Sequence, residues 1–452
     1  MYCVIPAAGR GVRFNELGKN YPKCVLPYKE IPIIAHNIQF ALDAGARVVT
    51  IVTGHQGQKI IDIVKMYFPD DDRIRFEDYQ HIGNGGPAVS IYCGVPETIN
   101  EPVLVLLSDI FVNTVPDMWF ATGSVSWISV QKVPDWNRWC MAEVEGDKIV
   151  AFHDKPEEKP PTNLAVSGVY YFGNGSLLRQ SLHEAIHNAR VRDGEIQISH
   201  AMTRYLNSES IQTKDVKIRD FGTLQEYLEN RGVRNSREFN HVHPSDKGMT
   251  ITKSSNVQPE KIHAEMNWYN NLPLSIKLLT PRILDKKPYG DTFNRWPSYV
   301  MERIDSPTLR ELYLYLESDP AFWSEIYNKI FDLTDSFKFY FKPGKSDFFQ
   351  KVATKNYDRY YQSSKDSIVQ TQFDFEFLHK FDEMANANEF DIFPDSLYHG
   401  DLCFSNIFYH PGSKQIKLID PRGDAYGNIL YDLAKLTHSA YYPYDYIDAE
   451  LY

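Results

Sequence analysis

Three polar residues near the end of the chain have the types and the spacing that phosphoryl transfer from ATP requires. Asp401 is followed five residues later by Asn406, and Asp420 comes directly after the apolar residues Leu418 and Ile419. One carboxylate can accept the proton of a hydroxyl group, while an amide and a second carboxylate supply oxygen ligands for Mg²⁺. The C-terminal half of the sequence therefore predicts a small-molecule kinase.

A second phosphate-binding pattern opens the chain. An apolar stretch leads into a loop with Gly9 and Gly11, and a Pro-Lys pair that ends at Lys23 follows after a short irregular segment. Backbone N–H groups of such a loop, from Ala8 to Gly11, can close on a polyphosphate, and Arg13 and Lys23 add positive charge. The third glycine of a dinucleotide-binding fingerprint is missing. Arg13 and Lys23 are the predicted catalytic residues of this half, in a reaction at a phosphate.

The composition limits the partners and the location of the protein. The chain has 452 residues and a formal net charge of −11, which argues against a nucleic-acid partner. Its five cysteines are dispersed without a C-x-x-C pair, as is usual for free thiols in a reducing compartment. No segment approaches the ~18 consecutive apolar residues of a membrane span. We therefore expect a cytoplasmic protein without membrane insertion, and the sequence leaves its oligomeric state open, a homo-oligomer included.

In the first half, short apolar runs alternate with helical patterns. Strands are expected at 2–6, 48–52, 103–107 and 125–130, and helices near 34–44, 58–67 and 86–93. This alternation predicts an α/β fold with a mostly parallel, Rossmann-like sheet wrapped by helices. Ligands of such sheets lie beyond the carboxyl ends of the strands. The Gly9 loop and Asp109 would both lie there, and Asp109 is a predicted metal ligand.

Four further motifs follow the glycine loop in a fixed order. Over about residues 1–230 the chain resembles the sugar-1-phosphate nucleotidylyltransferases. The resemblance rests on the opening A-A-G-x-G-x-R with its Pro-Lys pair, then on His-Asp-Lys-Pro around Lys155, the segments at 162–172 and 194–198, and Asp-Phe-Gly-Thr from Asp220. The resemblance implies that Lys155 binds the phosphate of a sugar phosphate and that Gly168 lies close to the sugar. By the same resemblance, Glu195 contacts sugar hydroxyls and Asp220 is the second metal ligand beside Asp109.

The nucleobase is expected to meet a loop near residue 85. Members of this family that use thymidine or uridine triphosphates place a glutamine five residues before the glycine that meets the base, and Gln80 and Gly85 resemble that pair. A pyrimidine nucleoside triphosphate is therefore favoured. The alternative is a turn supplied with glycines because it bends tightly.

A polar stretch separates two different modules. The sequence predicts a nucleotidylyltransferase domain at 1–232, a linker at 233–246 and a kinase domain at 247–452. In the kinase domain, an alternating pattern ends at Lys253, and Glu265 lies in a helical pattern twelve residues later. A strand lysine paired with a helix glutamate holds the α- and β-phosphates in kinases, so both residues are predicted to bind nucleotide.

The second module resembles the choline kinase and aminoglycoside phosphotransferase family, which implies a two-lobed, protein-kinase-like α+β domain. By this resemblance Asp401 accepts the substrate proton, and Asn406 and Asp420 hold the metal. Residues 299–302 resemble the hinge strand that meets adenine through its backbone, with Met301 as the predicted contact. Two departures stand out. Only Gly248 is present where a glycine-rich loop is expected, and the chain ends twenty residues after Asp432, so the kinase domain is expected to be compact or C-terminally incomplete.

Together these patterns predict a bifunctional enzyme that uses Mg²⁺. It would phosphorylate a sugar with ATP, at its anomeric position, and couple the phosphate ester to a nucleoside triphosphate, giving an NDP-sugar for surface polysaccharide and pyrophosphate. One alternative is a choline, ethanolamine or polyol kinase fused to a cytidylyltransferase, with an amino alcohol and its phosphate as partners. Another is a nucleotide-binding regulatory protein with an inactive kinase half.

Overall fold

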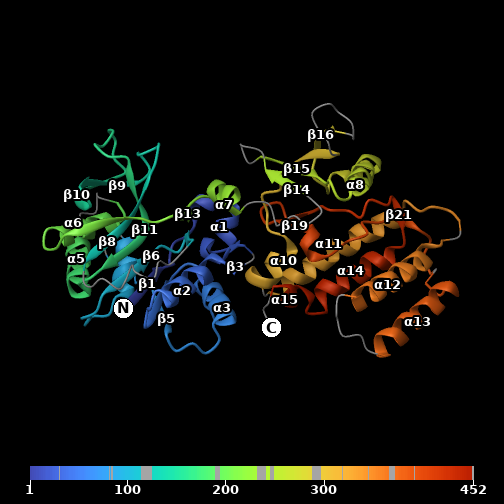
Figure 1. The fold of residues 1–452 in the computed structure, drawn as a ribbon, viewed down its shortest axis with the longest axis horizontal. Coiled ribbons are helices and arrows are strands. Elements are labelled where there is room, and N and C mark those ends of the chain that lie inside the picture. Colours follow the sequence, from blue (N-terminus) through green and yellow to red (C-terminus); the bar gives the residue numbers. More distant parts are fainter. Residues whose placement is uncertain are drawn as a thin grey trace. The chain divides into compact units, whose positions relative to one another are not determined.

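The computed structural model describes residues 1–29, 31–80, 82, 85–113, 125–188, 194–231, 241–244, 249–287, 297–317, 319–344, 346–365, 372–390 and 392–449. The chain divides into two compact units, Met1–Arg234 and Asn235–Glu450 (Figure 1). Within the described residues, no helix has the length and apolar character needed to cross a membrane. The two units are described in turn.

The N-terminal unit is built on one mixed sheet of nine strands. In spatial order they are β5 (Ile74–Asp78), β4 (Val48–Thr53), β1 (Tyr2–Pro6), β6 (Val103–Leu106), β11 (Leu164–Phe172), β8 (Ser126–Lys132), β12 (Ile211–Asp215), β10 (Lys148–Asp154) and β9 (Cys140–Glu145). The strands from β5 to β6 are parallel to one another, as predicted.

Beyond β6 the prediction of a mostly parallel sheet is wrong. There β11 runs antiparallel to both β6 and β8, and β9 runs antiparallel to β10. The reason is local, because β9 and β10 are joined by the two residues Gly146 and Asp147, and only an antiparallel pair can be closed by so short a turn. Gly146 has a φ of 67°, which glycine adopts without steric cost.

Helices cover this sheet and bury its apolar side chains. They are α2 (Ile33–Asp43), α3 (Gly57–Tyr67), α4 (Pro87–Gly94), α5 (Gly175–His187) and α6 (Ile198–Leu206), with the short α1 at Asn15–Asn20. The first three confirm the predicted helices. Figure 1 shows α5 and α6 beside the β9–β10 end of the sheet and α2 and α3 beside the β5 end. Val4, Val105 and Phe172 are among the fully buried core residues between these layers.

A small second sheet completes the unit. It pairs β7 (Ile110–Val112) with β13 (Ile218–Asp220), and α7 (Leu224–Arg231) follows directly. A two-stranded ladder of β2 (Pro27–Tyr28) and β3 (Ile31–Pro32) lies in the N-terminal segment. These short elements matter because Asp220 is the last residue of β13 and Asp109 directly precedes β7.

The C-terminal unit begins with an antiparallel sheet of four strands. In spatial order these are β14 (His241–Pro244), β15 (Thr250–Ser254), β17 (Ser298–Glu302) and β16 (Ile283–Lys287), with α8 (Pro259–Asn271) and α9 (Leu274–Lys277) in the connection from β15 to β16. The strand before Lys253 and the helix around Glu265 confirm the predicted elements. Strand β14 lies inside the predicted linker 233–246; most of that linker, and Gly248, lie outside the described residues.

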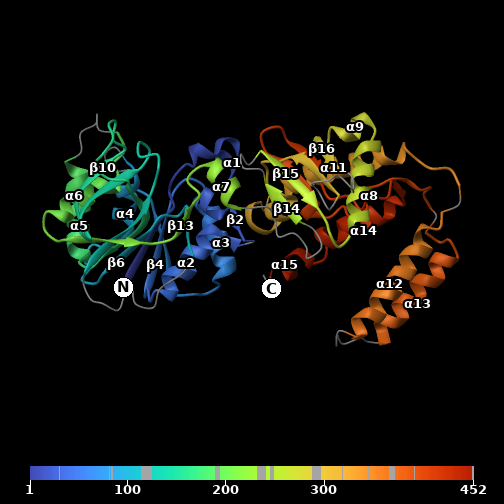
Figure 2. The same ribbon diagram turned by 45° about the horizontal axis from the view of Figure 1, so that its top comes forward.

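The rest of this unit is mainly helical. Its helices are α10 (Leu309–Glu311), a π-helical turn at Leu312–Leu316, α11 (Pro320–Lys338), α12 (Phe348–Lys365), α13 (Gln372–Asn386), α14 (Ile429–Ala440) and α15 (Tyr444–Asp448). Short ladders join β18 (Ser396–Leu397) to β21 (Tyr426–Gly427) and β19 (Ile407–His410) to β20 (Gln415–Leu418). Figure 2 shows α12 and α13 as a helical hairpin that extends from this unit.

Candidate active sites

Two carboxylates meet where the two sheets of the N-terminal unit adjoin. Asp109 lies between β6 and β7, and Asp220 is the last residue of β13, opposite Ile110. The N–H of Phe221 donates to the carbonyl oxygen of Asp109 at 2.8 Å. A Cβ atom at Gly222 would lie 3.1 Å from Oδ1 of Asp220 and 3.7 Å from Oδ2 of Asp109. Both carboxylates therefore line the space that Gly222 leaves open.

The charges at this pair are only partly balanced. The ammonium of Lys23 forms an ion pair with Oδ2 of Asp109. Burial, followed by the negative charges of Asp109 and Glu226, raises the pKa of Asp220 to about 7, although the N–H of Gly222 and the Lys23 charge oppose the rise. Two adjacent carboxylates with one lysine leave a net negative charge, and their oxygen atoms are the donors that Mg²⁺ prefers. The residues present thus fit this cation.

An aromatic cluster fixes the position of Asp220. Tyr227 packs against Phe14 and Phe221 packs against Tyr28, both in the N-terminal segment, and Tyr28 packs in turn against Phe111 of β7. The ring centroids lie 4.8–6.1 Å apart. The buried hydroxyl of Tyr227 also donates to the carbonyl oxygen of Pro27 at 3.0 Å. This cluster holds the end of the domain on the segment that carries Lys23.

The glycine loop after β1 leaves room beside its backbone. A Cβ atom at Gly9 would have no neighbour within 4 Å. Gly11 has a φ of 61°, and its carbonyl oxygen accepts from the N–H of Phe14 at 2.9 Å, which turns the chain into the next helical segment. On the other side, Ala8 packs so closely on Gly54 that a Cβ there would lie 2.9 Å from the Ala8 side chain. Arg13 is exposed.

Lys155 and Gly168 lie on the strands beyond β6. The N–H of Lys155, which has a φ of 43°, donates to the carbonyl oxygen of Trp139 at 2.9 Å. Gly168 has a φ of 104° within an irregularity of the β11–β8 pairing, and its carbonyl oxygen accepts from the N–H of Leu107 at 3.0 Å. A side chain at 168 would also crowd Ile110 at 3.2 Å. Glycine thus lets β11 pass close to the strand end that carries Asp109.

The predicted base loop and the Glu195 segment are bonded to each other. The carbonyl oxygen of Gly85 accepts from the N–H of Ile196 at 2.8 Å, and the N–H of Ala88 donates to the carbonyl oxygen of Ile196 at 3.0 Å. A Cβ at Gly86 would lie 2.6 Å from the nitrogen of Ile196 and 3.1 Å from Cβ of Glu195. The structure therefore brings Gly85 and Glu195 together, although 110 residues separate them.

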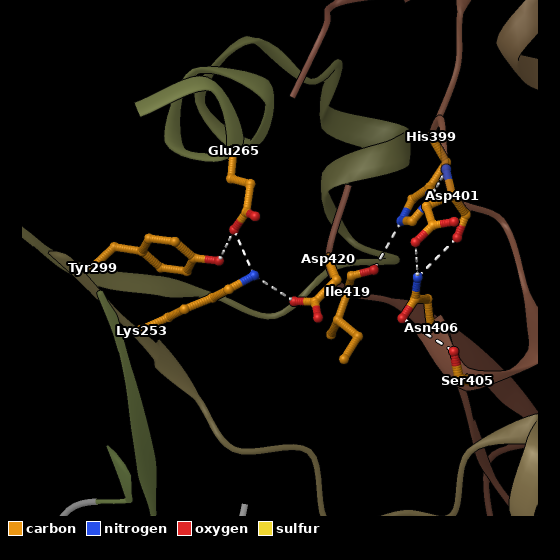
Figure 3. A network of polar contacts seen from close by, with 9 residues as sticks. All are labelled: Lys253, Glu265, Tyr299, His399, Asp401, Ser405, Asn406, Ile419 and Asp420. Atoms are coloured by element: carbon orange, nitrogen blue, oxygen red, sulfur yellow. Dashed lines mark hydrogen bonds and ion pairs between the residues drawn. The ribbon is translucent and has the colours of Figure 1, made fainter. Parts of the chain in front are cut away.

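In the C-terminal unit, Lys253 lies between two carboxylates. Its ammonium contacts Oε2 of Glu265 at 2.7 Å and Oδ1 of Asp420 at 2.9 Å, as Figure 3 shows. The hydroxyl of Tyr299 donates to the same Glu265 oxygen at 2.8 Å. Burial alone would raise the pKa of Asp420, but the charge and hydrogen bond of Lys253 lower it overall. Asp420 is therefore held in its ionised form.

Asp401 has a different partner at each oxygen. The amide of Asn406 donates to Oδ2 of Asp401 at 3.1 Å and to its carbonyl oxygen at 2.9 Å (Figure 3). The ammonium of Lys435, on α14, contacts Oδ1 at 3.0 Å. Because the Asn406 amide nitrogen is used in this way, its carbonyl oxygen is directed away from Asp401. Asn406 and Asp420 offer oxygen donors that fit Mg²⁺.

The segment that carries Asp401 is braced from inside. Asp432 accepts from the N–H groups of His399 and Gly400, both at 2.7 Å. The ring of His399 donates from Nε2 to the carbonyl oxygen of Ile419 at 2.9 Å and accepts at Nδ1 from the N–H of Asp401. Burial lowers the pKa of His399 to about 4, so the ring is neutral and keeps this arrangement. It ties the Asp401 segment to the strand end that carries Asp420.

Within the described residues, no group of three or more His, Cys, Asp and Glu side chains is placed to hold a metal ion. Both candidate magnesium sites would instead combine two protein ligands with phosphate oxygens, as Mg²⁺ commonly does.

Residues 2–233 match the nucleotidyl transferase family. The chain belongs to this family. Among its relatives, the UTP–glucose-1-phosphate uridylyltransferase of Pseudomonas aeruginosa is 26% identical over 265 residues, which cover 50% of this chain and 93% of that protein. The bifunctional protein GlmU of Methanocaldococcus jannaschii is 24% identical over 222 residues, covering 49% of this chain and 50% of that protein. A crystal structure of UDP-glucose pyrophosphorylase complexed with UDP-glucose is 25% identical, covers 51% of this chain and 97% of that one, and has a TM-score of 0.44.

In this nucleotidyl transferase, most of the residues predicted for a site lie close to others of the same site. Lys23 contacts Asp109, which lies beside Asp220, and Gly85 contacts the Glu195 segment. Gln80 follows β5 directly, and its carbonyl oxygen lies 4.0 Å from Sγ of Cys93.

One predicted contact fits poorly. Met301 lies in the middle of its sheet, opposite Ile251 of β15 on one side and Ile283 of β16 on the other. A backbone enclosed by two strands cannot also meet adenine, so the segment after Glu302, where β17 ends, fits a hinge better.

Sequence reasoning missed several residues of both sites. Arg138 forms ion pairs with Asp135 and Glu226, both at 2.7 Å, and so lies close to the charge of Asp220. Its partner is 88 residues away in the chain, so no spacing pointed to it. Lys435 lies three residues after Asp432, about one helical turn, and that spacing could have indicated a shared face.

Proposed function

We propose that the chain is a bifunctional enzyme that makes a phosphate ester with ATP and then couples it to a pyrimidine nucleoside triphosphate. The products would be an NDP-sugar, used for surface polysaccharide, and pyrophosphate. The observation that carries the proposal is that each unit holds its own lysine-paired carboxylate beside a second oxygen donor. These sets are Lys23 with Asp109 and Asp220, and Lys253 with Asp420 and Asn406.

The N-terminal reaction joins two anions. A phosphate oxygen of the sugar phosphate attacks the α-phosphorus of the nucleoside triphosphate, a new P–O bond forms, and the bond to pyrophosphate breaks. Such a reaction needs charge neutralisation and in-line positioning more than a proton acceptor. Lys23 and Lys155 supply fixed positive charge, and the open backbone at Gly9 gives the triphosphate access. Mg²⁺ held by Asp109 and Asp220 would add further neutralisation at the phosphates.

Family membership and the relatives support a sugar phosphate as the acceptor of the nucleotidyl group. The names of several relatives state UTP and glucose 1-phosphate as their substrates. The Gln80–Gly85 spacing also favours a pyrimidine base, as in UTP. We propose UTP as the first nucleotide to test, with a sugar-1-phosphate as its partner.

The C-terminal reaction would transfer the γ-phosphoryl group of ATP to a hydroxyl. Asp401 accepts the hydroxyl proton, the acceptor oxygen bonds to the γ-phosphorus, and the bond to ADP breaks. Lys253, oriented by Glu265 and Tyr299, binds the α- and β-phosphates. Asn406 and Asp420 would hold Mg²⁺, which neutralises the phosphate oxygens. The ammonium of Lys435, 3.0 Å from Oδ1 of Asp401, holds that carboxylate in place.

The two reactions form one sequence only if the kinase acts at the anomeric position. The nucleotidylyltransferase site would use a sugar-1-phosphate. A sugar phosphorylated at its primary hydroxyl could enter that reaction only after a mutase had moved the phosphate to the anomeric position. The consumption of ATP and a nucleoside triphosphate leads us to place the enzyme in the cytoplasm, where both are abundant. The five cysteines are free thiols, which agrees with that compartment.

The proposal is tested with the full-length protein in two stages. Sugars, amino alcohols and polyols are incubated with ATP and Mg²⁺, and products are identified by mass and by phosphorus NMR. A new ester should show coupling to an anomeric proton, and it should then be consumed with one preferred nucleoside triphosphate. Phosphocholine, phosphoethanolamine or glycerol phosphate serving as the better second substrate would favour the cytidylyltransferase alternative. ATP binding without turnover of any hydroxyl compound would favour an inactive kinase half.

A further inference from the structure

A basic side chain lies at one of the two carboxylate oxygens of Asp401. Oδ2 of Asp401 faces Asn406, on the side of Asp420 and Lys253, where the nucleotide phosphates are proposed to bind. Oδ1 faces Lys435 on α14. The acceptor must approach Asp401 without displacing the nucleotide, so the Lys435 side is the side left for it.

Arg422 adds a second cation next to the same segment. Its N–H donates to the carbonyl oxygen of His399 at 2.9 Å. A Cβ atom at Gly400 would lie 2.5 Å from Cβ of Arg422, so the arginine packs directly against the residue that precedes Asp401. Its guanidinium lies 5.3 Å from the ring centroid of Tyr431 and 3.4 Å from a carboxylate oxygen of Asp424. Tyr431 is one turn before Lys435 on α14.

Helix α12 supplies two more cations to this side. Phe348, at its start, packs on Tyr398 and on Tyr431 with centroids 5.5 and 5.6 Å apart. Lys355 follows seven residues later, which is two helical turns and hence the same face, and Arg359 follows one turn after that. The pKa of Lys355 is lowered by burial and then by the positive charges of Arg422, Arg359 and Lys435. Lys355 is thus close enough to each of the other three cations to be repelled by it.

The protein neutralises this group only in part, through the carboxylates of Asp424 and Asp401. Within the described residues, Arg422 pairs with Asp424 and Lys435 pairs with Asp401, while Lys355 and Arg359 form no ion pair. A chain with 59 acidic and 48 basic residues has many carboxylates that could serve as partners. Like charges gathered beside a reacting group destabilise the empty site and favour an anionic ligand.

We infer that the acceptor of the proposed kinase reaction carries a negative group, a carboxylate or a phosphate, which Lys355, Arg359 and Arg422 bind while its hydroxyl lies at Asp401. The inference rests on the proposed function and narrows its substrate class. It favours sugar acids and sugar phosphates over neutral sugars, and it disfavours choline, ethanolamine and amino sugars, whose positive charge the cluster would repel.

The test compares acceptors that differ only in charge. Full-length protein with ATP and Mg²⁺ is given glucose, glucuronate, glucose 6-phosphate and glucosamine, and the corresponding galacto and manno sets, and ADP formation is measured. An anionic member should have the largest kcat/KM. Lys355→Gln and Arg359→Gln should each raise the KM for it about tenfold with little change in kcat, as for the loss of one charge-assisted hydrogen bond. Glucuronate against glucose 6-phosphate distinguishes a carboxylate site from a phosphate site.

Lys351→Gln is the matched control. Lys351 lies one turn before Lys355 on the same helix, is 74% exposed and pairs with Asp347 at 2.8 Å. Removing this charge should leave the KM unchanged, which separates binding by the cluster from a general loss of positive charge. Raising the ionic strength should raise the KM of the native enzyme for the anionic acceptor and have less effect in the Lys355 and Arg359 variants.

Different outcomes separate the inference from the function on which it rests. A neutral or amino sugar as the best acceptor, with a KM insensitive to Lys355→Gln, would leave the kinase in place and overturn the anionic acceptor. If no acceptor is phosphorylated, the inference is tested by binding instead. The melting temperature of the protein is measured with glucuronate or glucose 6-phosphate in the presence of ADP and Mg²⁺. A stabilisation that is lost in Arg359→Gln would support the anionic site even then, and its absence would overturn the inference. Failure to bind ATP at all would reject the proposed kinase function itself.

Discussion

Each unit of the molecule places a lysine against a carboxylate, but the two pairs differ in what surrounds them. Lys23 is 25% exposed and pairs with Asp109 alone, while the adjacent Asp220 has its pKa raised to about 7. The side chain of Lys253 is 3% exposed and lies between Glu265 and Asp420, and the pKa of Asp420 is lowered. Each site therefore combines one lysine with two carboxylates, but Lys253 contacts both of its carboxylates, whereas the ion pair of Lys23 is with Asp109.

This difference indicates two ways of preparing a phosphate site. In the C-terminal unit, the buried Glu265 and the partly exposed Asp420 both contact the lysine, so its position does not depend on the nucleotide. In the N-terminal unit, Asp220 forms no ion pair with a lysine among the described residues, so under the proposed function a bound cation would complete the balance of charge. Under the proposed function, the C-terminal site would be preorganised, and the N-terminal site would be completed by its substrates.

The largest expected effects come from removing one carboxylate at a time. Asp401→Asn should lower ATP-dependent phosphorylation by ~10²–10⁴-fold, because it removes the proton acceptor, and should spare nucleotidyl transfer to a supplied sugar-1-phosphate. Asp109→Ala should abolish pyrophosphate release and spare phosphorylation. Assays of both reactions on each variant measure this separation. Loss of both activities in one folded variant would show that the sites are not chemically independent.

The two lysines should differ in their effects on stability. Lys253→Met leaves the buried Glu265 and the partly exposed Asp420 without their cation, and the unpaired buried charge should destabilise the C-terminal unit by ~3–5 kcal/mol. Lys23→Met removes a partly exposed pair and should change stability by less than ~1 kcal/mol while lowering nucleotidyl transfer. Hydrogen exchange resolved by peptide measures each unit separately within the full chain. Equal protection losses in the two variants would refute the contrast between a preorganised and an open site.

The pH dependence of stability should expose the charge imbalance at Asp220. Its pKa is 3.8 in a model peptide and about 7 in the fold, so between these values the native state holds a proton that the unfolded state has released. Stability should therefore fall as pH rises from about 4 to about 7, by a few kcal/mol at most, and level off above. Asp220→Asn should remove this slope.

The measurement is the difference in melting temperature between the native chain and Asp220→Asn, taken at pH 5 and pH 8 without divalent cations. This difference isolates Asp220 from Asp432, whose pKa burial also raises to about 7. Added Mg²⁺ should stabilise the native chain at pH 8 and have a smaller effect on the variant. If the stability of Asp220→Asn still falls between pH 5 and pH 8 as much as that of the native chain, the pH dependence arises from another group.

Much of both sites could be predicted because the residues stand in local patterns. The Gly9 loop follows a buried strand, Asp109 follows another, and the parallel part of the sheet brings these strand ends to one edge. The Lys253–Glu265 pair is likewise set by a strand and the next helix. In each case a short segment specifies the element, and the element directs the side chain.

The residues that could not be predicted depend on pairings across long separations. Arg138 approaches Asp220 only because Glu226, on a helix 88 residues later, pairs with it. The antiparallel pairings of β11 join it to β6 and β8, which lie far from it in the sequence, and the apolar runs of these strands look like those of buried parallel strands. Met301 has the right pattern for a hinge, but its place inside the sheet is decided by β16, a strand that comes before it and ends in polar residues.

The smallest effect on stability is expected at Gly9, and it contrasts with a glycine of the other unit. Gly9 has open space where a Cβ would be, so Gly9→Ala should change the stability by less than ~0.5 kcal/mol. Gly423 has a φ of 103°, and its Cβ would lie 2.5 Å from Cβ of Ala264, so Gly423→Ala should destabilise the C-terminal unit by ~1–3 kcal/mol.

If the open space at Gly9 admits a nucleotide, the methyl group added by Gly9→Ala should raise the KM for the nucleoside triphosphate about tenfold without unfolding the unit. Melting curves and initial rates on both variants test this, and an unchanged KM in Gly9→Ala would mean that the glycine loop does not approach the triphosphate.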